Sequence, residues 1–188
     1  MSLAHVLLTS LLEKPSTGFE LARRFDHSMG YFWQASHQQI YRELKQMLKK
    51  DWISITPDIT STRSKTYQVE QLGRIALTEW LSQHSAPAQV RDDLMVRLRA
   101  EAQLGGNQLL QELEQHLNIH RQTLNIYQQI FAKDFTRAAP KQRTLFIHRM
   151  ILELGIQMEQ TWIDWLENLI PQLKSFSLEN NVTKPEFF

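Results

Sequence analysis

The sequence contains no cysteine, and this absence excludes three kinds of chemistry. Disulfide bonds, thiolate zinc sites and cysteine nucleophiles all require a thiol. The chain of 188 residues also lacks a long apolar run, because its uninterrupted apolar segments span only a few residues, whereas a membrane-spanning helix needs about 20. The apolar start carries no basic segment and no small-residue cleavage site, so we expect a folded helix there rather than a signal peptide, and a cytoplasmic protein.

The motifs of common enzyme chemistry are also missing. Only six glycines are present, and no Gly-x-Ser-x-Gly turn presents a nucleophilic serine. The lone pair Gly105-Gly106 looks like a helix break rather than a phosphate-binding loop. His116 and His120 have the spacing of a metal pair, but no third ligand is evident, and the Glu-x-x-His spacing of di-iron bundles is absent. We therefore expect no enzyme activity, no bound metal and no cofactor.

The net charge is only +1, but positive charge is concentrated in one segment. Residues 36–65 contain six lysine or arginine residues and three aspartate or glutamate residues. On charge alone, this excess fits a solvated surface as well as it fits a surface that binds an acidic partner. The placement of the charges along a helix favours the second interpretation.

Residues 36–50 have the pattern of an amphipathic helix. Ser36 and Gln39 have the spacing of a capping box at its start. Asp51 follows the helix, at a position where the chain is expected to need a left-handed backbone conformation. One predicted face is apolar and consists of Ile40, Leu44, Met47 and Leu48. The other face is polar and basic, and carries His37, Gln38, Arg42, Lys45 and Lys49.

The elements around this helix have the order of a winged helix-turn-helix domain. Helices are predicted over residues 2–13 and from a second capping box, Thr17 to Glu20, onward, with an aromatic-rich turn at 29–33. The inward residues of that second helix are predicted to be Phe19, Leu21, Ala22 and Phe25. Residues 52–69 read as a β-hairpin with its tip near 59–65, and a further helix follows. The hairpin would be the wing.

The rest of the chain shows no strand signals. A short helix is predicted after residue 91, and long helices over 107–133 and 141–173 carry apolar residues in steps of three and four. The predicted fold is therefore mainly α, with a winged helix-turn-helix DNA-binding domain (1–84), a linker (85–90), an all-α, antiparallel, coiled-coil-like dimerisation domain (91–175) and a flexible tail (176–188).

In a winged helix-turn-helix domain the third helix enters the DNA major groove. Its glutamines can pair with adenine, its arginine with guanine or phosphate, and its lysines with phosphates. The start of the second helix can bind a phosphate, and basic residues of the wing suit the minor groove or the backbone. The predicted DNA-contacting residues are Thr17, Ser36, His37, Gln38, Gln39, Tyr41, Arg42, Lys45, Lys49, Arg63 and Lys65.

Four segments carry a resemblance to a known family: "GFELARRF", "QIYRELKQM", "SKTYQVEQLGRIALTEWL" and "VRDDLMVRL". They resemble the PadR family of bacterial transcriptional regulators, and the long C-terminal helices resemble its larger members, including the virulence activator subgroup. The resemblance implies a regulator that dimerises through these helices and, in many members, represses a gene until a small aromatic or cationic ligand binds. It places Tyr41 and Arg42 in the recognition-helix motif and Lys65 in the wing motif. One departure is Asp51, where the family usually has glycine.

The dimer interface is predicted from the apolar stripe of the last helix. The family resemblance adds the segment "VRDDLMVRL", which opens the C-terminal domain. Trp162 and Trp165 have two interpretations, since they suit either the dimer core or a pocket whose rings hold an effector. The predicted interface residues are Leu3, Leu94, Leu98, Ile151, Leu154, Met158, Trp162, Trp165 and Leu169.

These observations favour a sequence-specific transcriptional regulator; the resemblance implies a repressor, while activation and an effector role stay open. It would act as a homodimer on a pseudo-palindromic operator, with double-stranded DNA and a second copy as its partners and no membrane. The alternative is a winged-helix module that docks another protein and binds no specific DNA.

Overall fold

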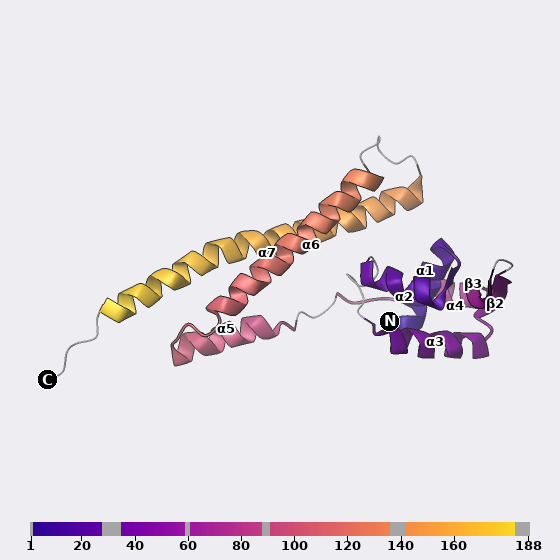
Figure 1. The fold of residues 1–188 in the computed structure, drawn as a ribbon, viewed down its shortest axis with the longest axis horizontal. Coiled ribbons are helices and arrows are strands. Elements are labelled where there is room, and N and C mark those ends of the chain that lie inside the picture. Colours follow the sequence, from indigo (N-terminus) through magenta and orange to yellow (C-terminus); the bar gives the residue numbers. More distant parts are fainter. Residues whose placement is uncertain (1, 28–34, 59–60, 88–90, 136–141, 183–188) are drawn as a thin grey trace. The chain divides into compact units, whose positions relative to one another are not determined.

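The computed structural model describes residues 2–27, 35–58, 61–87, 91–135 and 142–182 (Figure 1). The chain forms two compact units, Met1–Ala88 and Gln89–Phe188, and we describe each by itself. The first combines helices with a small sheet, and the described part of the second is entirely helical. The predicted fold class, mainly α with an N-terminal winged helix-turn-helix, is confirmed. Within the described residues, no helix is long and apolar enough to span a membrane.

The first unit has the element order that the sequence predicts. Its three strands form an antiparallel sheet in the order β1-β3-β2, in which Ser16 pairs with Tyr67 and Ile53 pairs with Val69. The predicted turn at 29–33 lies outside the described residues. The elements are α1 (Leu3–Glu13), β1 (Ser16–Thr17), α2 (Gly18–His27), α3 (His37–Lys49), β2 (Ile53–Asp58), β3 (Ser61–Val69) and α4 (Gln71–Leu81).

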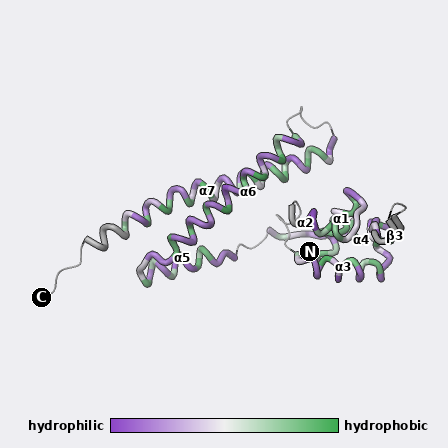
Figure 2. Tube along the Cα trace, viewed as in Figure 1, coloured by the Kyte–Doolittle hydropathy of each residue, from purple (hydrophilic) through white to green (hydrophobic). Residues whose placement is uncertain are grey.

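The core of the first unit lies between α1, α2 and the inner face of α3. Helix α1 is apolar on most sides, and it packs against α3 and α4. Along α3, apolar and polar residues alternate with helical spacing (Figure 2), so that one face is buried and the other is exposed. The core residues that are almost fully buried are Leu7, Leu8, Leu11, Leu21, Ala22, Ile40, Leu44 and Met47.

Two sequence predictions about this unit are wrong. Phe19 was predicted to face inward, but its side chain is 66% exposed. The wing was predicted to turn over residues 59–65, but its strands run to Asp58 and resume at Ser61, so Lys65 lies within β3 opposite Pro57. Strand pairing tolerates Pro57 because β2 is an edge strand, where a missing backbone N–H costs no bond to a further strand.

His5 makes the folding of the first unit sensitive to pH. Its ring stacks on Trp80 with centroids 4.8 Å apart, and burial, with smaller contributions from positive charges that include Lys50, lowers the pKa of His5 below its ordinary value of 6.5. Since the unfolded chain binds this proton more readily, the free energy of unfolding is expected to decrease as pH falls below about 6.5. The His5→Phe variant keeps a ring on Trp80 and should show a weaker decrease, measured by urea unfolding between pH 5 and 8. An equal decrease in both proteins would contradict this role for His5.

The second unit consists of α5 (Asp93–Leu104), α6 (Leu110–Asp134) and α7 (Arg143–Val182). Helices α6 and α7 pack along each other, and their shared core with α5 contains Leu94, Leu113, Leu166 and Ile170. The glycine break predicted at 105–106 is confirmed, because both glycines have positive φ angles. Helix α7 continues to Val182, into the segment predicted to be a flexible tail, and residues 183–188 lie outside the described part of the chain.

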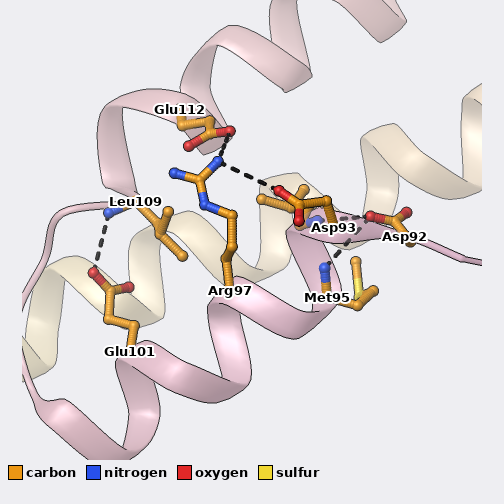
Figure 3. A network of polar contacts seen from close by, with 8 residues as sticks. Asp92, Asp93, Met95, Arg97, Glu101, Leu109 and Glu112 are labelled. Carbon is orange, nitrogen blue, oxygen red and sulfur yellow. Dashed lines mark hydrogen bonds and ion pairs between the residues drawn. The ribbon is translucent and has the colours of Figure 1, made fainter.

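Polar contacts tie α5 to the start of α6 (Figure 3). The Asp92 carboxylate accepts the backbone N–H of Leu94 at 2.9 Å, and it thereby caps α5. One helical turn apart, Arg97 donates to Glu112 of α6, and Glu101 accepts the backbone N–H of Leu109 at 3.1 Å. The bonds that Asp92 and Glu101 accept satisfy backbone N–H groups at the starts of α5 and α6, which would otherwise lack partners.

Candidate nucleic-acid interface

Helix α3 presents one continuous polar and basic surface. Ile40, Leu44 and Met47 point into the core, so the residues on the opposite side of the helix face solvent. We call this side the basic face of α3; its residues are Gln38, Arg42, Lys45 and Lys49, and all four are exposed. His37 was predicted to share this face, but it stands three residues before Ile40 and so lies on the apolar side, where the first turn of the helix leaves it exposed. A helix with this distribution can enter the major groove, where long polar side chains reach base edges and phosphates.

The predicted capping box at the start of α3 is present. The Ser36 hydroxyl accepts the backbone N–H of Gln39 at 3.3 Å, and the Gln39 side-chain oxygen accepts the backbone N–H of Ser36 at 2.8 Å. Bidentate pairing with adenine needs both the oxygen and the nitrogen of an amide. Gln39 therefore has its acceptor occupied by the helix cap, whereas Gln38 lies on the basic face.

The predicted capping box at the start of α2 is also present, and it bears on the expected phosphate contact of Thr17. The Glu20 carboxylate accepts both the backbone N–H of Thr17 at 2.8 Å and its hydroxyl at 3.0 Å. These bonds, the backbone one first, lower the pKa of Glu20, so the carboxylate is charged at neutral pH. A phosphate that approached Thr17 would meet this negative charge and compete for both donors.

Tyr41 lies at the edge of the basic face, against the start of α2. A Cβ atom on Gly18 would lie 2.5 Å from a ring carbon of Tyr41, so only glycine allows this close approach. Tyr67 of β3 is nearby, and burial, with a smaller contribution from Tyr41, raises the pKa of Tyr67. Tyr41 is therefore both a packing residue between α2 and the wing and a partly exposed neighbour of the basic face.

The structure describes the side chain of only one of the two predicted wing cations. Lys65 is exposed in β3, where it pairs with Pro57 of β2. Arg63 also belongs to β3, but its side chain lies outside the described part of the structure.

The predicted dimer residues divide into two groups. Leu3 packs against the core of the first unit, whereas five others lie in the core of the second unit: Leu94, Leu98, Trp162, Trp165 and Leu169. The remaining three, Ile151, Leu154 and Met158, are exposed, and the exposed fractions of Leu154 and Met158 are 57% and 56%.

Trp162 and Trp165, the predicted alternatives for an effector pocket, already contact other rings. The His120 ring stacks on Trp162 at 5.1 Å with the two planes only 5° apart, and Trp165 meets Trp162 edge-on at 5.4 Å. Glu159 holds His120 in place, with its carboxylate 2.6 Å from Nδ1. The sequence alone does not predict this contact, because His120 and Glu159 are 39 residues apart in the chain. No cluster of three or more metal-binding side chains occurs among the described residues.

Comparison with known proteins places this geometry in a family. Residues 7–79 match the transcriptional regulator PadR-like family, and residues 90–174 match the family described as virulence activator alpha C-term. A probable transcriptional regulator of Mycobacterium tuberculosis is 34% identical over 187 residues, which cover 93% of this chain and 98% of that protein. The structure of the Vibrio cholerae virulence activator AphA has a TM-score of 0.75 and 31% identity, over 93% of this chain and 99% of that one.

A third relative is the negative transcriptional regulator PadR of Bacillus subtilis, with 25% identity over 91% of this chain and 97% of that protein. Its structure in complex with operator DNA has a TM-score of 0.77 and covers 90% of this chain and 97% of that one. It has also been solved in complex with p-coumaric acid. These matches confirm the expected family and the expectation of a regulator rather than an enzyme. The chain belongs to the PadR-like family of DNA-binding transcriptional regulators.

Proposed function

We propose that this protein is a dimeric repressor that recognises a pseudo-palindromic operator through the basic face of α3. The observation that carries the proposal is the separation of α3 into an apolar face, with Ile40, Leu44 and Met47 buried, and an exposed face that carries three cations and Gln38. The Bacillus subtilis relative, a negative regulator with a structure on operator DNA, supports repression as the sign of regulation. Gln38 and Arg42 would read bases, and Lys45 and Lys49 would contact phosphates.

The other predicted contacts enter the proposal with distinct roles. Ser36 and Gln39 would orient α3 through their capping box, and Tyr41 would contact the backbone from the edge of the helix. Lys65 is well placed for a phosphate because it is exposed on the wing. Arg63 and His37 complete the proposed set. Thr17 could contact a phosphate only if its N–H and hydroxyl stopped donating to Glu20, so we assign it no part in the affinity for DNA.

Footprinting on DNA from upstream of the gene tests this proposal. Two recognition helices related by a two-fold axis should protect two patches separated by about one helical turn, or about 34 Å. The patches should have inverted-repeat sequences. A single continuous patch without symmetry would contradict a dimeric repressor. No protection of any upstream DNA, even at micromolar protein, would favour the protein-docking alternative.

The second copy is proposed to dock on the exposed apolar residues of α7. Beside the core-facing side of this helix, a strip of five exposed side chains runs over three turns: Phe146, Met150, Ile151, Leu154 and Met158. A strip of this size on a monomer marks an interaction site. Its last residue, Met158, lies one helical turn before Trp162, which packs on the core of the second unit.

Charging this strip is expected to separate the copies. The Leu154→Glu and Met158→Glu double variant should sediment as a monomer at micromolar concentration, because burying an unpaired carboxylate costs more than the about 2–7 kcal/mol of an unpaired neutral polar group. It should also bind the operator at least about tenfold more weakly, since one half-site alone remains. Gln172→Glu is the control, because it adds a charge to an exposed position of α7 well beyond the end of the strip at Met158. A double variant that stays dimeric would contradict the proposed interface.

An effector response is a further part of the proposal. The Bacillus subtilis relative has been solved with p-coumaric acid, a small aromatic acid. If a similar ligand stacked on Trp162, it would have to displace His120 from the ring face that it covers. Titration of p-coumaric acid should then quench tryptophan fluorescence and weaken operator binding in parallel, and His120→Ala should tighten ligand binding. No change in either signal would exclude this ligand.

A further inference from the structure

Arg24 belongs to α2, but its guanidinium bonds to groups outside this helix. It donates to the carbonyl oxygen of Ser10 at 3.0 Å and to that of Lys14 at 2.8 Å, at the end of α1. It also donates to the hydroxyl of Ser16, the first residue of β1, at 2.5 Å. One side chain therefore joins the end of α1, the strand β1 and the helix α2.

These three bonds suit an arginine in particular. Hydrogen bonds from a charged donor are about twice as strong as neutral ones, and the carbonyl end of a helix attracts a cation. Ser16 is only 2% exposed, and its hydroxyl donates to the Lys14 carbonyl at 3.0 Å, so its oxygen is free to accept from Arg24. The planar guanidinium presents its donors in fixed directions, whereas a lysine ammonium is a point charge on a flexible stem.

Strand β1 is short, and α2 supports both of its residues. It consists of two residues, of which Ser16 pairs with Tyr67 of β3, whereas strands usually span three to ten residues. Glu20 of α2 accepts the backbone N–H of Thr17 at 2.8 Å, and Arg24 bonds to Ser16. The bond of Glu20 spans three residues and is a local cap. The bond of Arg24 spans eight residues, so it fixes the strand relative to the helix.

Strand β3 connects this support to Lys65 of the wing. Lys65 lies two residues from Tyr67 along β3, which corresponds to about 7 Å. Alternate residues of a strand share a face, so Lys65 and Tyr67 lie on the same face of the sheet. Tyr67 packs against the core and lies near Tyr41 of α3. The position of Lys65 relative to α3 therefore depends on how firmly β1 and β3 are held.

We propose that Arg24 is a positioning residue for DNA binding, which holds the wing where Lys65 reaches a phosphate while α3 occupies the major groove. Arg24 itself touches no DNA. This inference rests on the proposed roles of α3 and Lys65. A wing that is already held in place makes its phosphate contact without a further cost of ordering, whereas a loosened wing loses much of that contact.

The Arg24→Lys variant tests this role because it keeps the positive charge and removes the planar fork. Lys65→Gln should weaken operator binding about fivefold and lower the slope of log K against log salt by about one. Arg24→Lys should weaken binding about two- to fivefold and lower the same slope, although no charge is lost. Ser16→Ala removes one of the three bonds, so it should act in the same direction with a smaller effect.

Double variants separate positioning of the wing from a general loss of stability. Adding Arg24→Lys to Lys65→Gln should cause little further loss, because the contact is already absent, whereas the losses should multiply when it is added to Lys49→Gln. Leu77→Ala is the control for destabilisation, since it removes a buried side chain of α4 and should leave the slope unchanged. Arg74→Lys makes the same exchange at an exposed position of α4 and should change neither affinity nor slope.

The measurement is an anisotropy titration of the operator at several salt concentrations, on variants that circular dichroism shows to be folded. Coupling of Arg24 to Lys65 and not to Lys49 would support the inference. Losses that multiply with both, equal coupling to both, or unchanged binding by Arg24→Lys would overturn it. If Arg24→Lys fails to fold, Ser16→Ala in the same cycles decides.

Two further outcomes separate this inference from the proposed function. If Lys65→Gln binds as the unmodified protein does while Arg42→Ala loses binding, the positioning of the wing is overturned and the role of α3 stands. If the unmodified protein shows no specific DNA binding, both proposals fail.

Discussion

Gly73→Ala is expected to destabilise the first unit by about 2–3 kcal/mol, because the added methyl group has no space. A Cβ atom there would lie 2.3 Å from the carbonyl oxygen of Trp52 and 3.0 Å from methyl groups of Leu8 and Val69. The Trp52 carbonyl cannot move away freely, since it accepts the backbone N–H of Glu70 at 2.9 Å. For a unit of this size, thermal unfolding followed by circular dichroism should show a midpoint lower by about 10–20 °C.

Gly155→Ala is the matched control, because it places the same methyl group on a helical glycine with a different neighbour. Its Cβ would meet ring carbons of Tyr127 at 3.0 and 3.5 Å, and a side chain can shift by the few tenths of an ångström required. Alanine also favours a helix over glycine by about 1 kcal/mol. The stability of the second unit should therefore change by less than about 1 kcal/mol. Equal midpoints for the two variants would contradict the close packing around Gly73.

Arg42→Ala is expected to weaken operator binding by about 1–3 kcal/mol, which is about 5–150-fold. Arg42 is exposed on the basic face of α3, with the apolar side of the helix anchored in the core, so the guanidinium can reach a guanine edge or a phosphate. Its exposure also means that the substitution should leave folding unchanged. The measurement is an anisotropy titration against the operator and against random DNA.

The comparison of the two DNA sequences shows what Arg42 reads. If Arg42 pairs with a base, the variant should lose more affinity for the operator than for random DNA; if it binds a phosphate, it should lose equally from both. Arg74→Ala on α4 removes the same charge from a helix that packs behind α1, and it should bind as the unmodified protein does. Operator affinity that is equal in a well-folded Arg42→Ala variant would exclude Arg42 from the interface.

The sequence was sufficient for features that depend on residues close together in the chain. Both capping boxes form with the predicted partners, since each bond spans only three residues. Asp51 has a φ of 54°, the left-handed conformation expected where the family usually has glycine, and aspartate tolerates it at low cost. The two faces of α3 follow directly from its helical period.

Features that depend on distant packing were not predictable in the same way. Phe19 stands near the start of a short helix, where few neighbours define the periodicity, so an exposed ring looked like a core residue. The apolar stripe of α7 was predicted to form one dimer interface. Its C-terminal part, with Trp162 and Leu169, packs within the chain, whereas Leu154 and Met158 nearer its start are exposed. Apolar spacing identifies a stripe but does not say which helix covers it.

We propose that the basic face of α3 binds a specific DNA sequence, and one titration decides whether it does. A labelled fragment from upstream of the gene is titrated at several salt concentrations, with unlabelled random DNA as competitor. The account predicts nanomolar to tens-of-nanomolar binding that survives the competitor, and an affinity that falls steeply as salt rises because several phosphate contacts release counterions. Binding that random DNA removes completely on every upstream fragment, or that does not respond to salt, would contradict it.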